Sequence, residues 1–204
     1  SLRIAGLKLV LAVWGAAIFA SVAFCIFLFV GAGFFAFEIF LTLLPAGLLF
    51  LAYKKYKYRF SAFRIETFPT IQLLVIALGL LYFSDAFFEN SKRWGEWDAW
   101  AIWTQHAKFL MSETSFVNLF SNQIPWTHPD YPLFLSSLVA MFWQLSQSAF
   151  VPAVIGYLIA ISLLVLILTA FYERGFRLFG LLLFLILAGS ETLFPFITWQ
   201  CADT

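Results

Sequence analysis

A run of 45 residues from Leu9 to Tyr53 contains a single charged side chain, Glu38. About 20 apolar residues cross the hydrocarbon core of a bilayer as an α-helix, so this run is long enough for two spans and must fold back. The Gly31-Ala32-Gly33 tripeptide near its middle suits a break, because glycine leaves helical geometry at little steric cost. The sequence therefore predicts helices over about 9–30 and 34–53, with Glu38 reaching the interface beside the turn.

The rest of the chain is also poor in charge. Of its 204 residues, 63% are hydrophobic and 11% are charged, whereas soluble domains carry about 25% charged residues. Side chains of this composition cannot cover a surface in water, so we expect an integral membrane protein that does not bind nucleic acid. The two cysteines, Cys25 and Cys201, are far apart and are predicted to be free thiols.

Clusters of basic residues indicate which ends of the spans face the cytoplasm. The densest cluster, Lys54–Arg59, follows the second predicted helix and is expected to be cytoplasmic by the positive-inside rule. A third span over Thr70–Phe83, extending towards Phe88, then carries the chain outward. A fourth span over Val151–Phe171 returns to a basic turn with Arg174 and Arg177, and a fifth over Leu178–Ile197 leads outward again.

The interval from Asp85 to Tyr131 is the longest polar stretch, and this topology places it outside the cytoplasm. An external loop should be poor in basic residues, and this one carries six acids and three bases. These are Asp85, Glu89, Glu96, Asp98, Glu113 and Asp130 against Lys92, Arg93 and Lys108.

Two stretches are predicted to be helices that lie in the outer membrane interface. Glu96–Ser112 has a helical period with two faces. One face carries Trp100, Trp103, Ala107, Leu110 and Met111, and the other carries Asp98, Thr104, Gln105, Lys108 and Ser112. We expect the tryptophans to dip into the headgroups, Asp98 to face water and His106 to be an interfacial side chain. Leu133–Leu145 is too short for a span, and a polar side formed by Ser136, Ser137, Gln144 and Gln147 favours an interfacial helix.

The predicted fold class is an all-α polytopic membrane protein with about five transmembrane helices and interfacial helices in the first large external loop. Residues 1–67 form a two-helix hairpin with a basic cytoplasmic loop, and residues 68–204 form the second unit.

Three short motifs occur in order on the external side: Glu96-Trp97-Asp98-Ala99-Trp100, His128-Pro129-Asp130-Tyr131-Pro132 and Gln200-Cys201-Ala202-Asp203-Thr204. With these motifs, residues 68–204 resemble GT-C glycosyltransferases, most closely the bacterial branch related to protein O-mannosyltransferases and the lipid A aminoarabinose transferase. The chain differs from the simplest members by the extra hairpin over 9–53. It also lacks their later helices, so we expect it to be the N-terminal part of a longer enzyme with an incomplete catalytic core.

The resemblance implies an enzyme that transfers a sugar from a polyprenyl-phosphate donor to an acceptor hydroxyl on a glycan, lipid or protein. By motif, Asp98 matches the general base, and Asp203 matches an acid that supports the acceptor or a metal. His128 and Asp130 match positions at the substrate site, with Tyr131 beside them and Glu96 near the base. We expect the protein in a bacterial inner membrane, with the active loop facing the periplasm or exterior.

Physical chemistry agrees with these roles but leaves one choice open. A sugar hydroxyl is a weak nucleophile, and a carboxylate that removes its proton accelerates transfer by about 10²–10⁴-fold. The leaving lipid phosphate needs a cation, for which Lys92, Arg93 and Lys108 are candidates. A divalent metal held by Asp98, Glu96 or Asp203 could serve instead.

Two other classes fit parts of the pattern. A non-enzymatic transporter or assembly subunit could use the external loop to bind a ligand or partner, but a transporter should carry polar groups within its spans. The predicted spans are nearly without them, which favours a surface-facing enzyme. A polymerase or ligase of surface polysaccharide would share the donor chemistry but not the order of the motifs.

Overall fold

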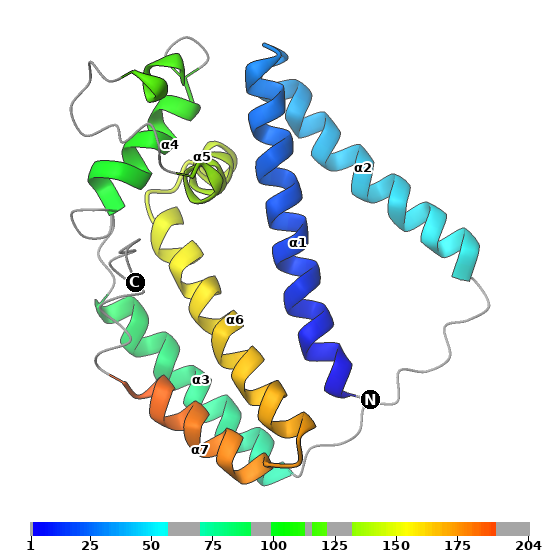
Figure 1. Ribbon diagram of the computed structural model, residues 1–204, viewed down its shortest axis with the longest axis vertical. Coiled ribbons are helices and arrows are strands. Elements are labelled where there is room, and N and C mark those ends of the chain that lie inside the picture. The colour runs from blue at the N-terminus through cyan, green and yellow to red at the C-terminus, as the bar shows by residue number, and fades with distance from the viewer. Residues whose placement is uncertain (1, 57–69, 91–98, 113–115, 122–131, 191–204) are drawn as a thin grey trace.

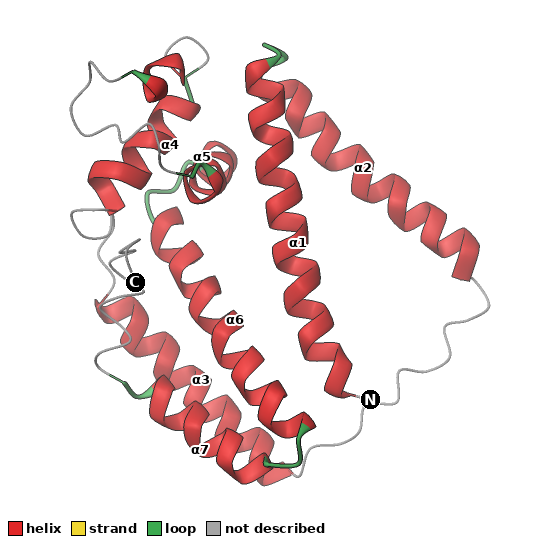
Figure 2. Cartoon of the chain, viewed as in Figure 1, coloured by secondary structure: helices red, strands yellow, loops and turns green. Residues whose placement is uncertain are grey.

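The computed structural model describes residues 2–56, 70–90, 99–112, 116–121 and 132–190. These residues form helices joined by loops, and none of them forms a strand (Figure 2). Four helices are long and apolar enough to cross a membrane. They are α1 (Leu2–Phe29), α2 (Gly33–Tyr56), α3 (Thr70–Asn90) and α6 (Val151–Glu173). The prediction of an all-helical, membrane-embedded protein is confirmed at this level.

The break between the first two helices lies at the predicted tripeptide. Gly31 and Gly33 have φ angles of 68° and 74°, in the region that only glycine enters easily. The N–H of Ala32 donates to the carbonyl of Phe27 at 3.0 Å, and the N–H of Gly31 donates to the carbonyl of Leu28 at 3.0 Å. These bonds satisfy carbonyls that the end of α1 would otherwise leave without partners, which is essential in an apolar environment.

α3, α6 and α7 (Arg177–Ala188) pack together around one apolar cluster, at the lower left of Figure 1. Phe83 and Phe184 are among its fully buried members. The Ser84 and Tyr157 hydroxyls share a hydrogen bond of 2.7 Å between α3 and α6. Close approach of α7 is possible because Gly180 has no side chain, and a Cβ there would lie 2.7 Å from the Cβ of Phe171.

α7 covers less of the chain than the predicted fifth span. Its 12 residues rise about 18 Å, short of the roughly 30 Å hydrocarbon core. The remainder of the Leu178–Ile197 prediction reaches beyond Ser190 and lies outside the described residues, so a fifth span stays a prediction.

Shorter helices gather at the end of the bundle where α1 ends and α6 begins (Figure 1). They are η1 (Ala99–Thr104), α4 (Gln105–Leu110), η2 (Phe116–Phe120) and α5 (Phe134–Ser146). In Figure 1, α5 is seen nearly end-on while the long helices run across the page, so it crosses them. A helix over Leu133–Leu145 is therefore confirmed, whereas its position in the membrane interface stays a prediction.

α1 connects this end of the bundle to the remaining helices. The Trp14 indole Nε1 donates to Ser162 Oγ on α6 at 2.8 Å. Ser21 and Ser137 share a hydrogen bond that joins α1 to α5. On the side towards α2, the Phe24 ring lies 5.3 Å from the ring of Phe37.

The packing at Gly180 predicts that alanine substitutions at two glycines, Gly180 and Gly47, change the stability of the protein in different ways. We expect Gly180→Ala to destabilise the protein by about 1–3 kcal/mol, because the new methyl group overpacks α7 against α6. Gly47 on α2 has no atom within 4 Å of a Cβ position, so Gly47→Ala should instead be neutral or stabilising by up to about 1 kcal/mol. Thermal unfolding of both variants in the same detergent measures the difference, and an unchanged midpoint for Gly180→Ala would contradict the close packing.

Candidate polar site at the α4–α5 junction

Among the predicted site residues, the structure describes Lys108, which is exposed on α4. The other predicted residues lie outside the described part of the chain. They are Glu96, Asp98, Lys92, Arg93, His128, Asp130, Tyr131 and Asp203. The structure does describe the helical scaffold that follows Asp98 in the chain.

That scaffold begins with η1, a π-helix whose first residue is Ala99, directly after Asp98 in the sequence. A π-helix bonds residue i to i+5; it is rare, and its short forms are frequently found at functional sites. It places fewer degrees of rotation between successive residues than an α-helix does, so side chains after it are out of phase with a continuous α-helix. The prediction of one regular helix over Glu96–Ser112 is therefore wrong in this respect.

The change in phase explains three incorrect side-chain positions. Thr104 was expected on the water-facing side, but it is 2% exposed. His106 was expected at the interface and is 0% exposed. Trp103, expected among the headgroups, is buried with Leu135 packed against its cluster. Its ring centroid lies 6.5 Å from that of His106, in an edge-on arrangement.

The serines of α5 also face the protein interior. The sequence instead predicted an interfacial helix whose polar side points away from the apolar core. Ser136 and Ser137 are both 0% exposed. Ser137 Oγ donates to the carbonyl of Phe134 at 2.9 Å and bonds the Ser21 hydroxyl of α1. The half-buried Cys25 on α1 is a free cysteine, as predicted. Packing against α1 and α4 explains this burial, because α5 has protein on the side where water was expected.

Among the residues that the structure describes, two buried hydroxyls in this region have no hydrogen-bond partner: Thr104 Oγ1 at the end of η1 and Ser136 Oγ on α5. A buried hydroxyl without a partner costs about 1–3 kcal/mol, so each such group needs an explanation, such as a bound water or ion or a catalytic role. η1, α4 and α5 pack against one another, so both hydroxyls belong to one junction. We call Trp103, Thr104, His106 and Ser136 the junction cluster.

The junction cluster has the chemistry of a site for a neutral, hydroxyl-rich ligand. Hydroxyl groups donate and accept, an imidazole does both in its neutral form, and an indole presents an apolar face with one donor. The cluster itself contains no carboxylate, so acid–base chemistry would have to come from a neighbouring segment. Asp98 immediately precedes η1 in the chain and is the nearest acid in the sequence.

No metal site can be assigned in the described part of the chain, where no group of three or more His, Cys, Asp or Glu side chains lies close enough to hold an ion. The predicted metal candidates, Asp98, Glu96 and Asp203, lie outside that part. A divalent cofactor therefore stays a prediction.

The sequence carried a signal for the residues that were missed. Ser21 lies within an apolar span, and Ser136 and Ser137 are adjacent in an apolar helix. Polar side chains in such segments are normally bonded to a neighbouring helix or form part of a functional site. Thr104 had no comparable signal, because its burial depends on the π-helical turn.

Comparison of the chain with protein-family models, with curated proteins and with solved structures gives no match.

The hydrogen bonds of neighbouring serines yield a prediction for this site. We expect Ser137→Ala to destabilise the protein by about 1 kcal/mol, because it removes one of the two hydrogen-bond partners of the buried Ser21 hydroxyl, the other being the carbonyl of Phe134 at 3.4 Å. Ser136→Ala should leave stability unchanged or raise it, because the lost hydroxyl has no partner. Thermal unfolding of the ligand-free protein measures both effects. If Ser136→Ala lowered the unfolding midpoint as much as Ser137→Ala does, the result would contradict the absence of a hydrogen-bond partner for the Ser136 hydroxyl.

Proposed function

We propose that the protein is a membrane glycosyltransferase that uses a polyprenyl-phosphate-linked sugar as its donor. In this proposal Asp98 removes the proton from an acceptor hydroxyl, which then attacks the anomeric carbon. The observation that carries it is the junction cluster, whose partnerless hydroxyls Thr104 Oγ1 and Ser136 Oγ lie in and beside the segment that directly follows Asp98. A sugar is a ligand that such hydroxyls, an imidazole and an indole can bind.

The arrangement of charges supports the same chemistry. A departing lipid phosphate is stabilised by a nearby cation. Lys108 is exposed on α4, the helix that continues η1, so it belongs to the same end of the bundle as the cluster. Lys92 and Arg93 precede Asp98 by a few residues and are further candidates. The resemblance to GT-C enzymes adds Asp203, Glu96, His128, Asp130 and Tyr131 as groups around the acceptor and donor.

The hydrogen bonds within the spans favour an enzyme over a transporter. Ser84 with Tyr157, and Trp14 with Ser162, are pairs that bond one helix to another. Their polar atoms are used for packing and do not line a polar path. The partnerless hydroxyls instead gather at one end of the bundle, where a reaction at the membrane surface would take place.

We expect Asp98→Asn to reduce sugar transfer by about 10²–10⁴-fold, because the amide cannot accept the acceptor's proton. Transfer from a polyprenyl-phosphate-linked sugar in membranes measures the effect, using the full reading frame that contains this chain. Asp85→Asn is the matched control, since Asp85 is an exposed acid on α3 that has no assigned role. Full turnover by Asp98→Asn would exclude the general-base role.

The junction cluster can be tested separately from the base. We expect Ser136→Ala to lower kcat/KM by up to about tenfold, because a neutral hydrogen bond contributes about 0.5–1.5 kcal/mol and tenfold corresponds to about 1.4 kcal/mol. Ser146→Ala is the control on the same helix, since that hydroxyl is exposed and bonds the carbonyl of Phe142 at 2.7 Å. Equal activity of the two variants would remove Ser136 from the site.

A further inference from the structure

Two arginines flank the turn between α6 and α7, at the opposite end of α6 from the junction cluster (Figure 1). Arg174 directly follows α6, and Arg177 is the first residue of α7. Both side chains are exposed, and neither forms an ion pair with a side chain that the structure describes. Glu173–Arg177 contains one acid and two bases, so this segment carries a net positive charge.

Contacts from α3 and α6 fix the position of the Arg177 guanidinium. Its carbon Cζ lies over the Tyr172 ring, 4.7 Å from the ring centroid, within the range of a cation–π contact. The Tyr172 hydroxyl in turn donates to Gln72 Oε1 on α3 at 3.2 Å. A guanidinium carries its N–H groups in its own plane, so one that lies over a ring can still donate to an anion at its edge. Arg177 is therefore held ready for bidentate hydrogen bonding to an anion such as a phosphate.

The turn lies where two apolar stretches long enough to cross a membrane end together. These stretches are Ile71–Glu89 of α3 and Val151–Tyr172 of α6. The hydrogen bond between Gln72 and Tyr172 joins the first turn of one stretch to the last turn of the other. Because the hydrocarbon core ends at this level, the two arginines belong to the headgroup layer, where anionic lipids attract basic side chains.

The side chains next to the arginines are apolar and exposed. Phe176, Leu178 and Phe179 have exposed fractions of 62%, 69% and 56%. A soluble phosphate would contact the guanidinium groups alone, whereas a phospholipid would also cover these side chains with its acyl chains. We propose that Arg174 and Arg177 bind the phosphate of an anionic phospholipid, with its hydrocarbon against the apolar side chains of the turn. A zwitterionic phospholipid fits less well, because the two guanidinium groups repel its ammonium group.

This lipid site is separate from the proposed sugar site and does not rest on it. The 23 residues of α6 rise about 34 Å, and the two sites lie at opposite ends of this helix. A donor whose sugar reaches the junction cluster would therefore hold its phosphate far from the two arginines.

Native mass spectrometry of the delipidated protein in detergent tests the proposal by titration with phosphatidylglycerol. We expect Arg177→Gln to lower the affinity about tenfold, which corresponds to about 1.4 kcal/mol. Arg177→Lys keeps the charge but loses the planar set of donors, so it should also bind more weakly than the unmodified protein. Lys8→Gln is the matched control, because Lys8 is an exposed cation near the start of α1, at the same end of the bundle (Figure 1). Lys8→Gln should bind as the unmodified protein does.

Four results would overturn the proposal. Equal affinities of Arg177→Gln and Lys8→Gln would reduce the site to general surface charge, and full affinity of Arg177→Lys would do the same. Two further measurements use the unmodified protein and do not depend on a variant that folds. Binding of phosphatidylcholine as strong as that of phosphatidylglycerol would show that the charge of the headgroup is not recognised. Displacement of phosphatidylglycerol by an equimolar concentration of inorganic phosphate would assign the arginines to a soluble anion.

Discussion

The structure depends on the hydrogen bonds and ring contacts that fix α1 to its neighbours. Trp14 bonds Ser162 of α6, and Ser21 bonds Ser137 of α5. In hydrocarbon there is no water to satisfy these groups, and apolar side chains gain little from leaving lipid, so such contacts determine how helices associate. α6 in turn holds α3 and α7 through the aromatic cluster around Phe83. α1 packs against both α5 and α6, so it joins the short helices at one end to the α3–α6–α7 group.

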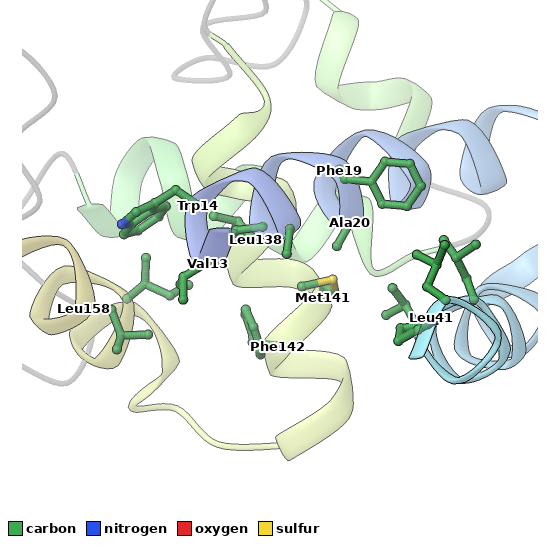
Figure 3. Close-up of a pocket in the computed structure, with 15 residues that line it drawn as sticks. Val13, Trp14, Phe19, Ala20, Leu41, Leu138, Met141, Phe142 and Leu158 are labelled. Carbon is green, nitrogen blue, oxygen red and sulfur yellow. The ribbon is translucent and has the colours of Figure 1, made fainter. Parts of the chain in front are cut away.

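α5 separates two regions of different chemistry. Its apolar residues Leu138 and Met141 line an apolar groove between α1, α2, α5 and α6 (Figure 3), whereas Ser136 belongs to the junction cluster near η1. A short helix that crosses the long ones can face an apolar groove on one side and a polar site on another. None of the residues of the junction cluster lines the apolar groove, so the groove and the proposed sugar site are separate.

Local patterns in the sequence predicted most of the helices. The spans over 9–30, 34–53, 70–88 and 151–171 correspond to α1, α2, α3 and α6, because apolar runs of this length reflect the thickness of a bilayer. The turn at Gly31–Gly33 was also predictable, because glycine is needed at its positive φ angles. The directions in which Thr104 and Ser136 point were not, since they depend on a π-helical turn and on which helices cover α5.

The sequence by itself determined that the chain is helical and membrane-embedded, where the first hairpin turns, and that six of its acids lie in the polar interval from Asp85 to Tyr131. These properties follow from hydropathy and from the demand that backbone groups bond internally in lipid. Only the tertiary structure decided that Thr104, His106 and Ser136 are buried together, and that α1 and α2 leave an apolar groove. Both outcomes depend on contacts between segments far apart in the chain, such as Ser21 with Ser137, which no local pattern encodes.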